Sequence, residues 1–283
     1  MAKTEIIKYN DCDNNRLRFY PTGFCSLPLP LRSVGNRYIR SVTNCGNIDM
    51  ISSKFVPYGM YGRLALIAMT SLAKDTDAVT RTTDYDSLYL MLEKLNGKKP
   101  TGPQFNKFKN QLLALCTTLV TFNHISTNQR SVSNMILVDK ATFLSMEKCG
   151  TKEYTGTIRF SETGYKFLNA NAMPIPVKAL HEIVQPFKFD VLVWLLVSLY
   201  PIRRGQRVMV PWLKLYEQYG VTEEVKKHNF RHTFSILLDE VAEKYYPDAR
   251  FSIDVSRRGG IMLESSPRLL FKDDTCLTPI MPF

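Results

Sequence analysis

Residues 221–264, VTEEVKKHNFRHTFSILLDEVAEKYYPDARFSIDVSRRGGIMLE, combine an amphipathic helix with a β-hairpin. Thr222 is a good N-cap residue, and apolar side chains recur at helical spacing after it. This apolar stripe consists of Val225, Phe230, Phe234, Leu238 and Val241. Residues 251–255 then alternate apolar with polar side chains, residues 256–260 form a turn, and residues 261–264 return, which predicts a hairpin.

Two more helices precede this stretch. The helix that Pro186 begins extends to Tyr200 and is apolar on nearly every side, which indicates a central position. Pro211 begins a short helix with one apolar face, and Gly220 ends it. Three helices followed by a hairpin is the order of a winged helix, a helix-turn-helix fold with a β-hairpin, or wing, beside its last helix.

The first half of the chain repeats this order. Helical patterns begin near Gly59, at the N-cap Ser87 and near Pro103. The second of these helices stops at Asn96-Gly97, and the third continues to Leu115. We expect the two strands after the third helix to form a wing, with one more short strand later in the chain. The expected strands are Thr117–Asn123, Met135–Val138 and Thr157–Phe160.

The expected fold class is α+β, with two tandem winged-helix domains. The first 50 residues are polar, basic and interrupted by the Leu27-Pro-Leu-Pro-Leu31 run, which predicts a mostly irregular N-terminal arm. The expected division is a basic, partly disordered arm at 1–50, winged-helix domains at 51–168 and 169–268 with a hinge near Asn169–Pro176, and a C-terminal tail at 269–283.

The charge of the chain favours a polyanionic partner. Its 283 residues include 37 Lys and Arg against 26 Asp and Glu, a formal net charge of +11, and the pI is near 9.3. Nucleic acid or an anionic membrane surface would suit this charge. The first eight residues lack the apolar core of a secretory signal, and the longest strongly apolar stretch, Val191–Tyr200, is about half a membrane span. We therefore expect a cytoplasmic protein without a membrane segment.

The cysteines and histidines do not form a pattern typical of metal sites. The six cysteines are scattered without a C-x-x-C pair, which predicts free thiols in a reducing cytosol. His228 and His232 have helical i, i+4 spacing, but no third ligand lies near them in the sequence. We expect neither a metal nor a cofactor.

The third helix of each domain carries the candidate DNA-binding residues. Arg and Lys suit phosphates and guanine edges, and Asn and Gln suit adenine. Two arginines at the tip of the second hairpin could reach a neighbouring phosphate or the minor groove. The candidates are Lys226, Lys227, Asn229, Arg231, His232, Arg257 and Arg258 in the second domain, and Gln104, Asn106, Lys107, Lys109 and Asn110 in the first.

One segment resembles an enzyme motif. His228–Phe234 is similar to the His-x-x-Arg box of tyrosine recombinases, in which His and Arg bind the scissile phosphate and a later tyrosine attacks it. Tyr245 and Tyr246 lie only about four turns beyond Arg231 on one predicted helix, so neither could turn back to that phosphate. The chain also lacks a P-loop and a Gly-x-Ser-x-Gly elbow. We therefore expect no enzymatic activity, and a recombinase-like strand transferase remains an alternative.

An ordered series of short motifs resembles the plasmid-encoded RepA-type replication initiators. The resemblance covers about residues 55–268, and the helix after Thr101-Gly102 departs from it, because that helix is often richer in arginine in the family. The motifs are Val56-Pro-Tyr-Gly-Met-Tyr-Gly-Arg-Leu64, Asp86-Ser-Leu88, Thr101-Gly102, Lys107-Phe-Lys-Asn-Gln111, Phe189-Asp-Val-Leu-Val-Trp-Leu195, Val210-Pro-Trp212, Tyr219-Gly220, Asn229-Phe-Arg231, Tyr246-Pro-Asp-Ala249 and Ile261–Pro267.

The resemblance implies a function that the residues alone do not give. It implies two winged-helix domains that bind direct repeats (iterons) of double-stranded DNA in a plasmid origin and open the duplex. It also implies recruitment of the host initiator and replicative helicase, and often a homodimer that represses its own gene. The alternatives are a winged-helix repressor without initiation activity and a winged helix that binds protein.

Overall fold

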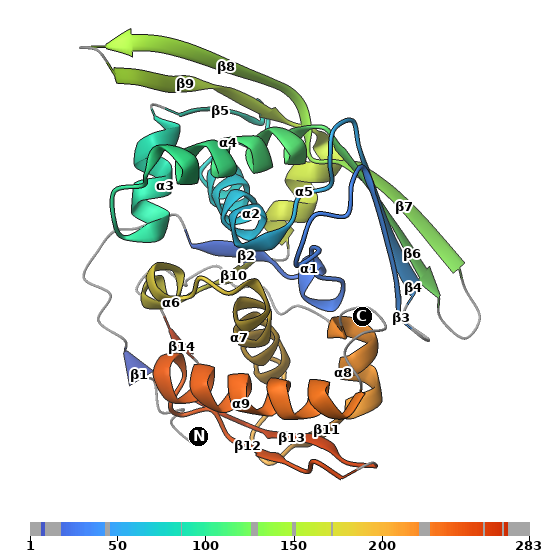
Figure 1. Cartoon of the computed structure of the whole chain (residues 1–283). Helices are drawn as coiled ribbons and strands as arrows, with labels where there is room; N and C mark the ends of the chain where they lie inside the picture. The colour runs from blue at the N-terminus through green and yellow to red at the C-terminus, as the bar shows by residue number, and fades with distance from the viewer. Residues whose placement is uncertain are drawn as a thin grey trace.

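Two helical units, each with a three-stranded antiparallel sheet, lie at opposite ends of the molecule in Figure 1. The structure is a computed structural model that describes residues 7–8, 18–42, 46–85, 87–125, 130–148, 151–170, 172–220, 227–256, 258–267 and 269–270. In these parts of the chain no helix is long and apolar enough to cross a membrane.

The second unit follows the helix–strand–helix–helix–strand–strand order of a winged helix. Its sheet has the order β11-β13-β12, with the last strand in the centre. Phe230, Phe234, Leu238 and Val241 of the expected apolar stripe are buried, and Val225 lies outside the described residues. The elements are α7 (Pro186–Leu199), β11 (Arg207–Pro211), α8 (Trp212–Tyr219), α9 (Lys227–Tyr245), β12 (Phe251–Ile253) and β13 (Gly260–Glu264).

The first unit has the same sheet topology and the same order of elements, except that two strands of another sheet come between its third helix and its last two strands. Its sheet runs β5-β9-β8, again with the last strand in the centre. The expected fold class, two winged helices in tandem, is therefore confirmed. The elements are α2 (Gly59–Lys74), β5 (Thr82–Tyr85), α3 (Leu88–Asn96), α4 (Gly102–Cys116), β8 (Val138–Lys148) and β9 (Thr151–Phe160).

The strands expected to form the first wing belong to a different sheet. β6 (Thr118–Ile125) and β7 (Arg130–Ile136) follow α4 directly, but β6 pairs with β4 (Gly46–Ser52), which pairs with β3 (Arg37–Val42). We call this four-stranded sheet, β3-β4-β6-β7, the side sheet. The first wing is instead the long β8–β9 hairpin, which points away from the side sheet in Figure 1. Periodicity located β6 and the end of β9, but the expected strand Met135–Val138 spans the end of β7 and the start of β8, and the length of β8 was not expected. Periodicity also carries no information on which strand lies beside which.

The N-terminal segment is not an irregular arm over its described parts. Besides β3 and β4, it contains β2 (Phe19–Pro21) and α1 (Gly23–Ser26). Its apolar side chains lie in the core. The proline-rich run interrupts the apolar pattern of the sequence, so this burial was not expected. The fully buried ones include Tyr20, Phe24, Leu29, Ile48 and Met50. A short strand, β1 (Ile7–Lys8), pairs in parallel with β14 (Leu269–Leu270), and the other residues before 18 lie outside the described ranges.

The segment between the units is a packed crossover, where the sequence suggested a hinge. It contains α5 (Glu162–Ala170), β10 (Ala172–Pro174) and α6 (Val177–Glu182). β10 pairs antiparallel with β2, and all three residues of β10 are buried. The first residues of the second half are therefore held by the N-terminal segment.

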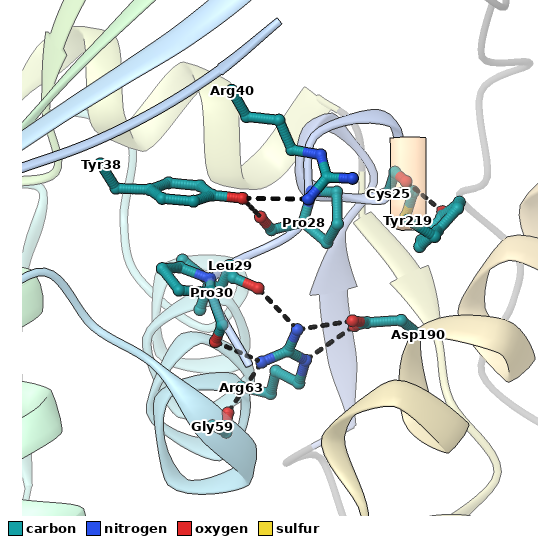
Figure 2. Close-up of polar contacts among 10 residues, drawn as sticks. All are labelled: Cys25, Pro28, Leu29, Pro30, Tyr38, Arg40, Gly59, Arg63, Asp190 and Tyr219. Atoms are coloured by element: carbon teal, nitrogen blue, oxygen red, sulfur yellow. Dashed lines mark hydrogen bonds and ion pairs between the residues drawn. The ribbon is translucent and has the colours of Figure 1, made fainter. Parts of the chain in front are cut away.

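A buried ion pair joins the central helices of the two units. Arg63 of α2 and Asp190 of α7 have side chains that are 0% and 4% exposed. Arg63 donates from Nε to Asp190 Oδ1 (2.7 Å) and from Nη2 to Oδ2 (2.5 Å). Its other donors reach the carbonyl oxygens of Leu29 (2.8 Å), Gly59 (2.9 Å) and Pro30 (3.4 Å), as Figure 2 shows. All five guanidinium N–H groups thus have acceptors, as a charge at this depth requires.

The start of α3 offers a test of local stability. Ser87 is its N-cap, and the Ser87 hydroxyl accepts a hydrogen bond from Leu90 N (3.3 Å), as the sequence predicts. We expect Ser87→Ala to lower the free energy of unfolding by about 1 kcal/mol, because that amide loses its acceptor. Urea unfolding measures the change, and Ser87→Thr, which keeps a hydroxyl, is the control. Equal stability of both variants would show that the cap contributes nothing.

Candidate DNA interface

The third helix of each unit, α4 or α9, has one buried and one exposed face. In α4, Phe105, Phe108, Leu112 and Leu115 pack into the core. In α9, the apolar stripe packs against α7, and Phe234 lies at the centre of an aromatic cluster. In a helix-turn-helix the second helix of the motif enters the major groove, and this helix is the third helix of each unit. The outer faces of α4 and α9 are therefore the candidate reading surfaces.

The outer face of α4 is polar and basic. Asn106, Lys107 and Asn110 are exposed, and α4 contains no acidic residue. Asparagine can read adenine through a bidentate pair of hydrogen bonds, and lysine can bind phosphate or guanine. The structure brings these three predicted residues together on one surface.

Gln104, also predicted to contact DNA, is engaged in the first turn of α4. Its Oε1 accepts a hydrogen bond from the backbone N–H of Thr101 at 2.8 Å. This is half of a capping box, which satisfies an N–H group that the helix itself leaves unpaired. The structure gives Gln104 a role in starting the helix.

Lys109 turns from α4 toward the first wing. Its Nζ donates to the hydroxyl of Tyr154 on β9 (3.3 Å) and lies 4.3 Å from the centre of that ring. This cation–π contact and hydrogen bond attach the third helix to its wing. This contact lies within the protein, and the DNA contact expected of Lys109 from the sequence stays a prediction.

Arg231 makes the equivalent attachment in the second unit. Its Nη1 donates to the carbonyl oxygens of Ser256 (3.3 Å) and Val255 (3.5 Å), at the turn of the second wing, β12–β13. The same turn is fixed by Trp212 Nε1, which donates to Asp254 O (2.6 Å). Each third helix therefore holds its wing with one basic side chain.

The remaining candidates of the second unit lie near these contacts. Asn229 and His232 are exposed on the early turns of α9, and Arg258 is exposed at the wing turn. Lys227 begins α9, but its side chain is not described, and Lys226 and Arg257 lie outside the described residues. A role in DNA binding stays a prediction for all of them.

The structure adds basic residues that the sequence did not single out. Lys140 and Arg159 are exposed and are cross-strand partners on the first wing. Lys98 and Lys99 are exposed in the turn between α3 and α4. Lys140 and Arg159 are distant in the chain, so their proximity depends on strand register, whereas the lysine pair at 98–99 was visible as a charge cluster beside a helix start.

The residues behind the recombinase-like motif have other partners. The hydroxyl of Tyr245 donates to Glu182 Oε2 (3.1 Å) and that of Tyr246 to Pro267 O (2.6 Å). Both side chains are buried. Burial raises the pKa of Tyr245 most, and the nearby Glu182 carboxylate raises it further. Among the described residues, no group of three or more His, Cys, Asp or Glu side chains could hold a metal ion.

Comparison with known proteins supports the fold. No family model matches the chain, and no curated protein matches it either. Two solved structures of domains 2 and 3 of RctB are similar, each 12% identical. The first has a TM-score of 0.54 and covers 87% of this chain and 98% of its own; the second has a TM-score of 0.52 and covers 86% and 94%. At this identity the likeness establishes the tandem winged-helix fold, and it does not show membership of the RepA-type family.

Proposed function

We propose that the chain is a sequence-specific, double-stranded-DNA-binding replication initiator. One observation carries the proposal: two winged-helix units whose three-stranded sheets have the same topology each present a polar or basic third-helix surface beside a wing. The net charge of +11 supports a polyanionic partner. The similar structures come from RctB, a replication initiator, which supports initiation over repression alone.

The finer parts of the proposal follow the sequence resemblance to RepA-type initiators. These are binding to direct repeats at a plasmid origin, opening of the duplex, recruitment of the host initiator and helicase, and repression of the protein's own gene. The proposed activity involves no catalysis by the chain, so binding energy must do the work. Two linked units gain affinity through effective concentration, and together they can bend the DNA between them.

A footprint on the DNA that flanks the gene, at two salt concentrations, tests the proposal. Protection of several evenly spaced direct repeats, weakening steeply with salt, is the expected result. Protection of one inverted repeat would instead favour a repressor, and no protection at low salt would contradict DNA binding. Replication of an origin fragment only in cells that carry the gene separates initiation from repression.

Two substitutions on the third helices are expected to weaken DNA binding in different ways. Asn229→Ala should cost about 1–3 kcal/mol on the specific site and little on other DNA, if Asn229 reads a base. Lys107→Ala should weaken binding to all sequences and reduce the salt slope by about 0.9, if Lys107 binds phosphate. Fluorescence anisotropy at several salt concentrations measures both.

Lys166→Ala is the matched control for the loss of one charge. Lys166 lies on α5, outside the third helices, is exposed and pairs with Glu162 at 2.6 Å. It should leave affinity and slope unchanged. If Asn229→Ala and Lys107→Ala behave like this control, the third helices do not contact DNA.

A further inference from the structure

The C-terminal end of α8 is capped by a residue from the other half of the chain. The last carbonyl groups of a helix have no partners within the helix. Arg40, on β3 of the side sheet, donates from Nη2 to Gly220 O (2.9 Å) and Glu217 O (3.0 Å), and from Nε to Glu217 O (3.3 Å). A cation at this position also interacts favourably with the helix dipole.

A second contact holds the same helix end. The hydroxyl of Tyr219, the last residue of α8, donates to the carbonyl oxygen of Cys25, and Tyr219 is buried. The guanidinium of Arg40 is itself oriented, because its Nη1 donates to the Tyr38 hydroxyl (3.4 Å), which donates to Pro28 O (3.5 Å). Figure 2 shows these side chains together with the Arg63–Asp190 pair.

The capped end of α8 lies against α9, because the rings of Tyr216 and Tyr219 have their centres 5.4 Å and 6.1 Å from those of Phe230 and Phe234 on α9. Gly220 follows α8 directly, and α9 begins only seven residues later, at Lys227. In a helix-turn-helix the second helix supports the third, so the end of α8 sets where the early turns of α9 lie. Base contacts require side chains held within about 0.5 Å of their productive positions.

We infer that Arg40 is a positioning residue for sequence reading by the second unit: it fixes the end of α8, and thereby the exposed early turns of α9, from the side sheet of the first half. This inference rests on the proposed DNA-binding function. In this role Arg40 contributes to DNA recognition without touching DNA itself. It also couples the side sheet to the reading surface of the second unit.

Arg37 provides a matched control on the same strand. It is an odd number of residues from Arg40, so the two side chains lie on opposite faces of the sheet. Arg37 pairs with Asp49 (2.6 Å), and its side chain is 57% exposed. Arg37→Met therefore removes the same charge from the same strand without touching α8.

The test compares full-length wild type, Arg40→Met, Arg40→Lys, Tyr219→Phe and Arg37→Met. Each is titrated with DNA that carries the footprinted site and with unrelated DNA of equal length, at several salt concentrations. We expect Arg40→Met to lose about 10- to 100-fold in affinity for the specific site while its salt slope and its affinity for unrelated DNA stay unchanged. Arg40→Lys should recover part of the loss, Tyr219→Phe should show a smaller loss of the same kind, and Arg37→Met should show no change in specific affinity.

Hydrogen exchange of the Gly220 amide gives a readout independent of DNA. This amide donates to Tyr216 O (2.7 Å) in the last turn of α8, and it should exchange faster in Arg40→Met but not in Arg37→Met. Unchanged specific affinity in both Arg40→Met and Tyr219→Phe would overturn the inference. So would an equal loss on both DNAs with a salt slope lower by about 0.9, which would make Arg40 a phosphate contact. If wild type binds neither DNA at low salt, the proposed function fails instead.

Discussion

Arg63→Ala is expected to lower the free energy of unfolding by about 3–5 kcal/mol, because it leaves the buried Asp190 carboxylate without its partner. Burial raises the pKa of Asp190, and the Arg63 guanidinium opposes that rise. Without Arg63 the pKa of Asp190 rises further. A carboxyl group whose pKa is raised in the native state destabilises that state when it is charged, and this cost falls as the pH is lowered. The loss of stability in Arg63→Ala should therefore be smaller at about pH 5 than at about pH 7. Urea unfolding at the two pH values measures both effects.

The double variant Arg63→Met, Asp190→Leu distinguishes the loss of a pair from the loss of packing. Removing both charges removes the cost of burying either, so we expect most of the lost stability to return. Recovery should be incomplete, because Leu29 O loses its donor, whereas Pro30 O keeps the hydrogen bond from Gly59 N (2.9 Å). A single variant within about 1 kcal/mol of wild type would show that the pair does not hold α2 against α7.

Long periodic segments of the sequence predicted the helices of both units well. The expected helix from Pro186 to Tyr200 is α7 at Pro186–Leu199, and the expected helix from about Pro103 to Leu115 is α4 at Gly102–Cys116. The stop at Asn96-Gly97 is confirmed by the left-handed backbone of Gly97 (φ 66°) after α3. Each of these signals is local, so the sequence carries it in full.

Strand pairing was not predictable, because it depends on contacts distant in the chain. Met50 and Val120 are cross-strand partners in the side sheet, and nothing local at either position identifies the other. The same limit applied to the first wing, because β6, the strand next to α4, pairs with β4 of the N-terminal segment, and the true wing, β8–β9, follows later in the chain. The expectation of an irregular arm was wrong, because apolar residues of this proline-rich segment are buried against elements distant in the chain. Tyr20 packs on Phe189 of α7, and Phe24 packs on residues of β6 and α5.

In the candidate interface, too, local features were predictable and contacts between distant parts of the chain were not. Helical spacing predicted that Asn106, Lys107 and Asn110 share an exposed face of α4. It could not show that Lys109 and Arg231 reach back to the wings, because both the position and the register of a wing are tertiary properties. No local pattern could predict the contacts of Arg40, because its acceptors lie 177 and 180 residues away in the chain.

Phe234→Ala is expected to lower the free energy of unfolding by about 3–5 kcal/mol through the cavity it leaves. Phe234 is 0% exposed and lies at the junction of the three helices of the second unit. Its ring centre is 5.3 Å from Trp194 on α7, 5.6 Å from Phe230 on α9, and 6.1 and 6.2 Å from Tyr219 and Trp212 on α8. These edge-to-face and tilted contacts add to the apolar area that the ring buries.

The two tryptophans of the chain make this substitution measurable without a label. Both contact Phe234, so unfolding followed by intrinsic fluorescence reports directly on the cluster that the variant disturbs. Phe234→Leu refills most of the volume and should cost less than half as much, about 1.5 kcal/mol. Ile236→Ala, two residues along α9 and 44% exposed, should change stability by no more than about 0.5 kcal/mol. Removing a ring packed at a junction of three helices should lower the free energy of unfolding more than removing a surface side chain does. If Phe234→Ala lowers it no more than Ile236→Ala, the aromatic cluster does not hold the third helix of the second unit in place.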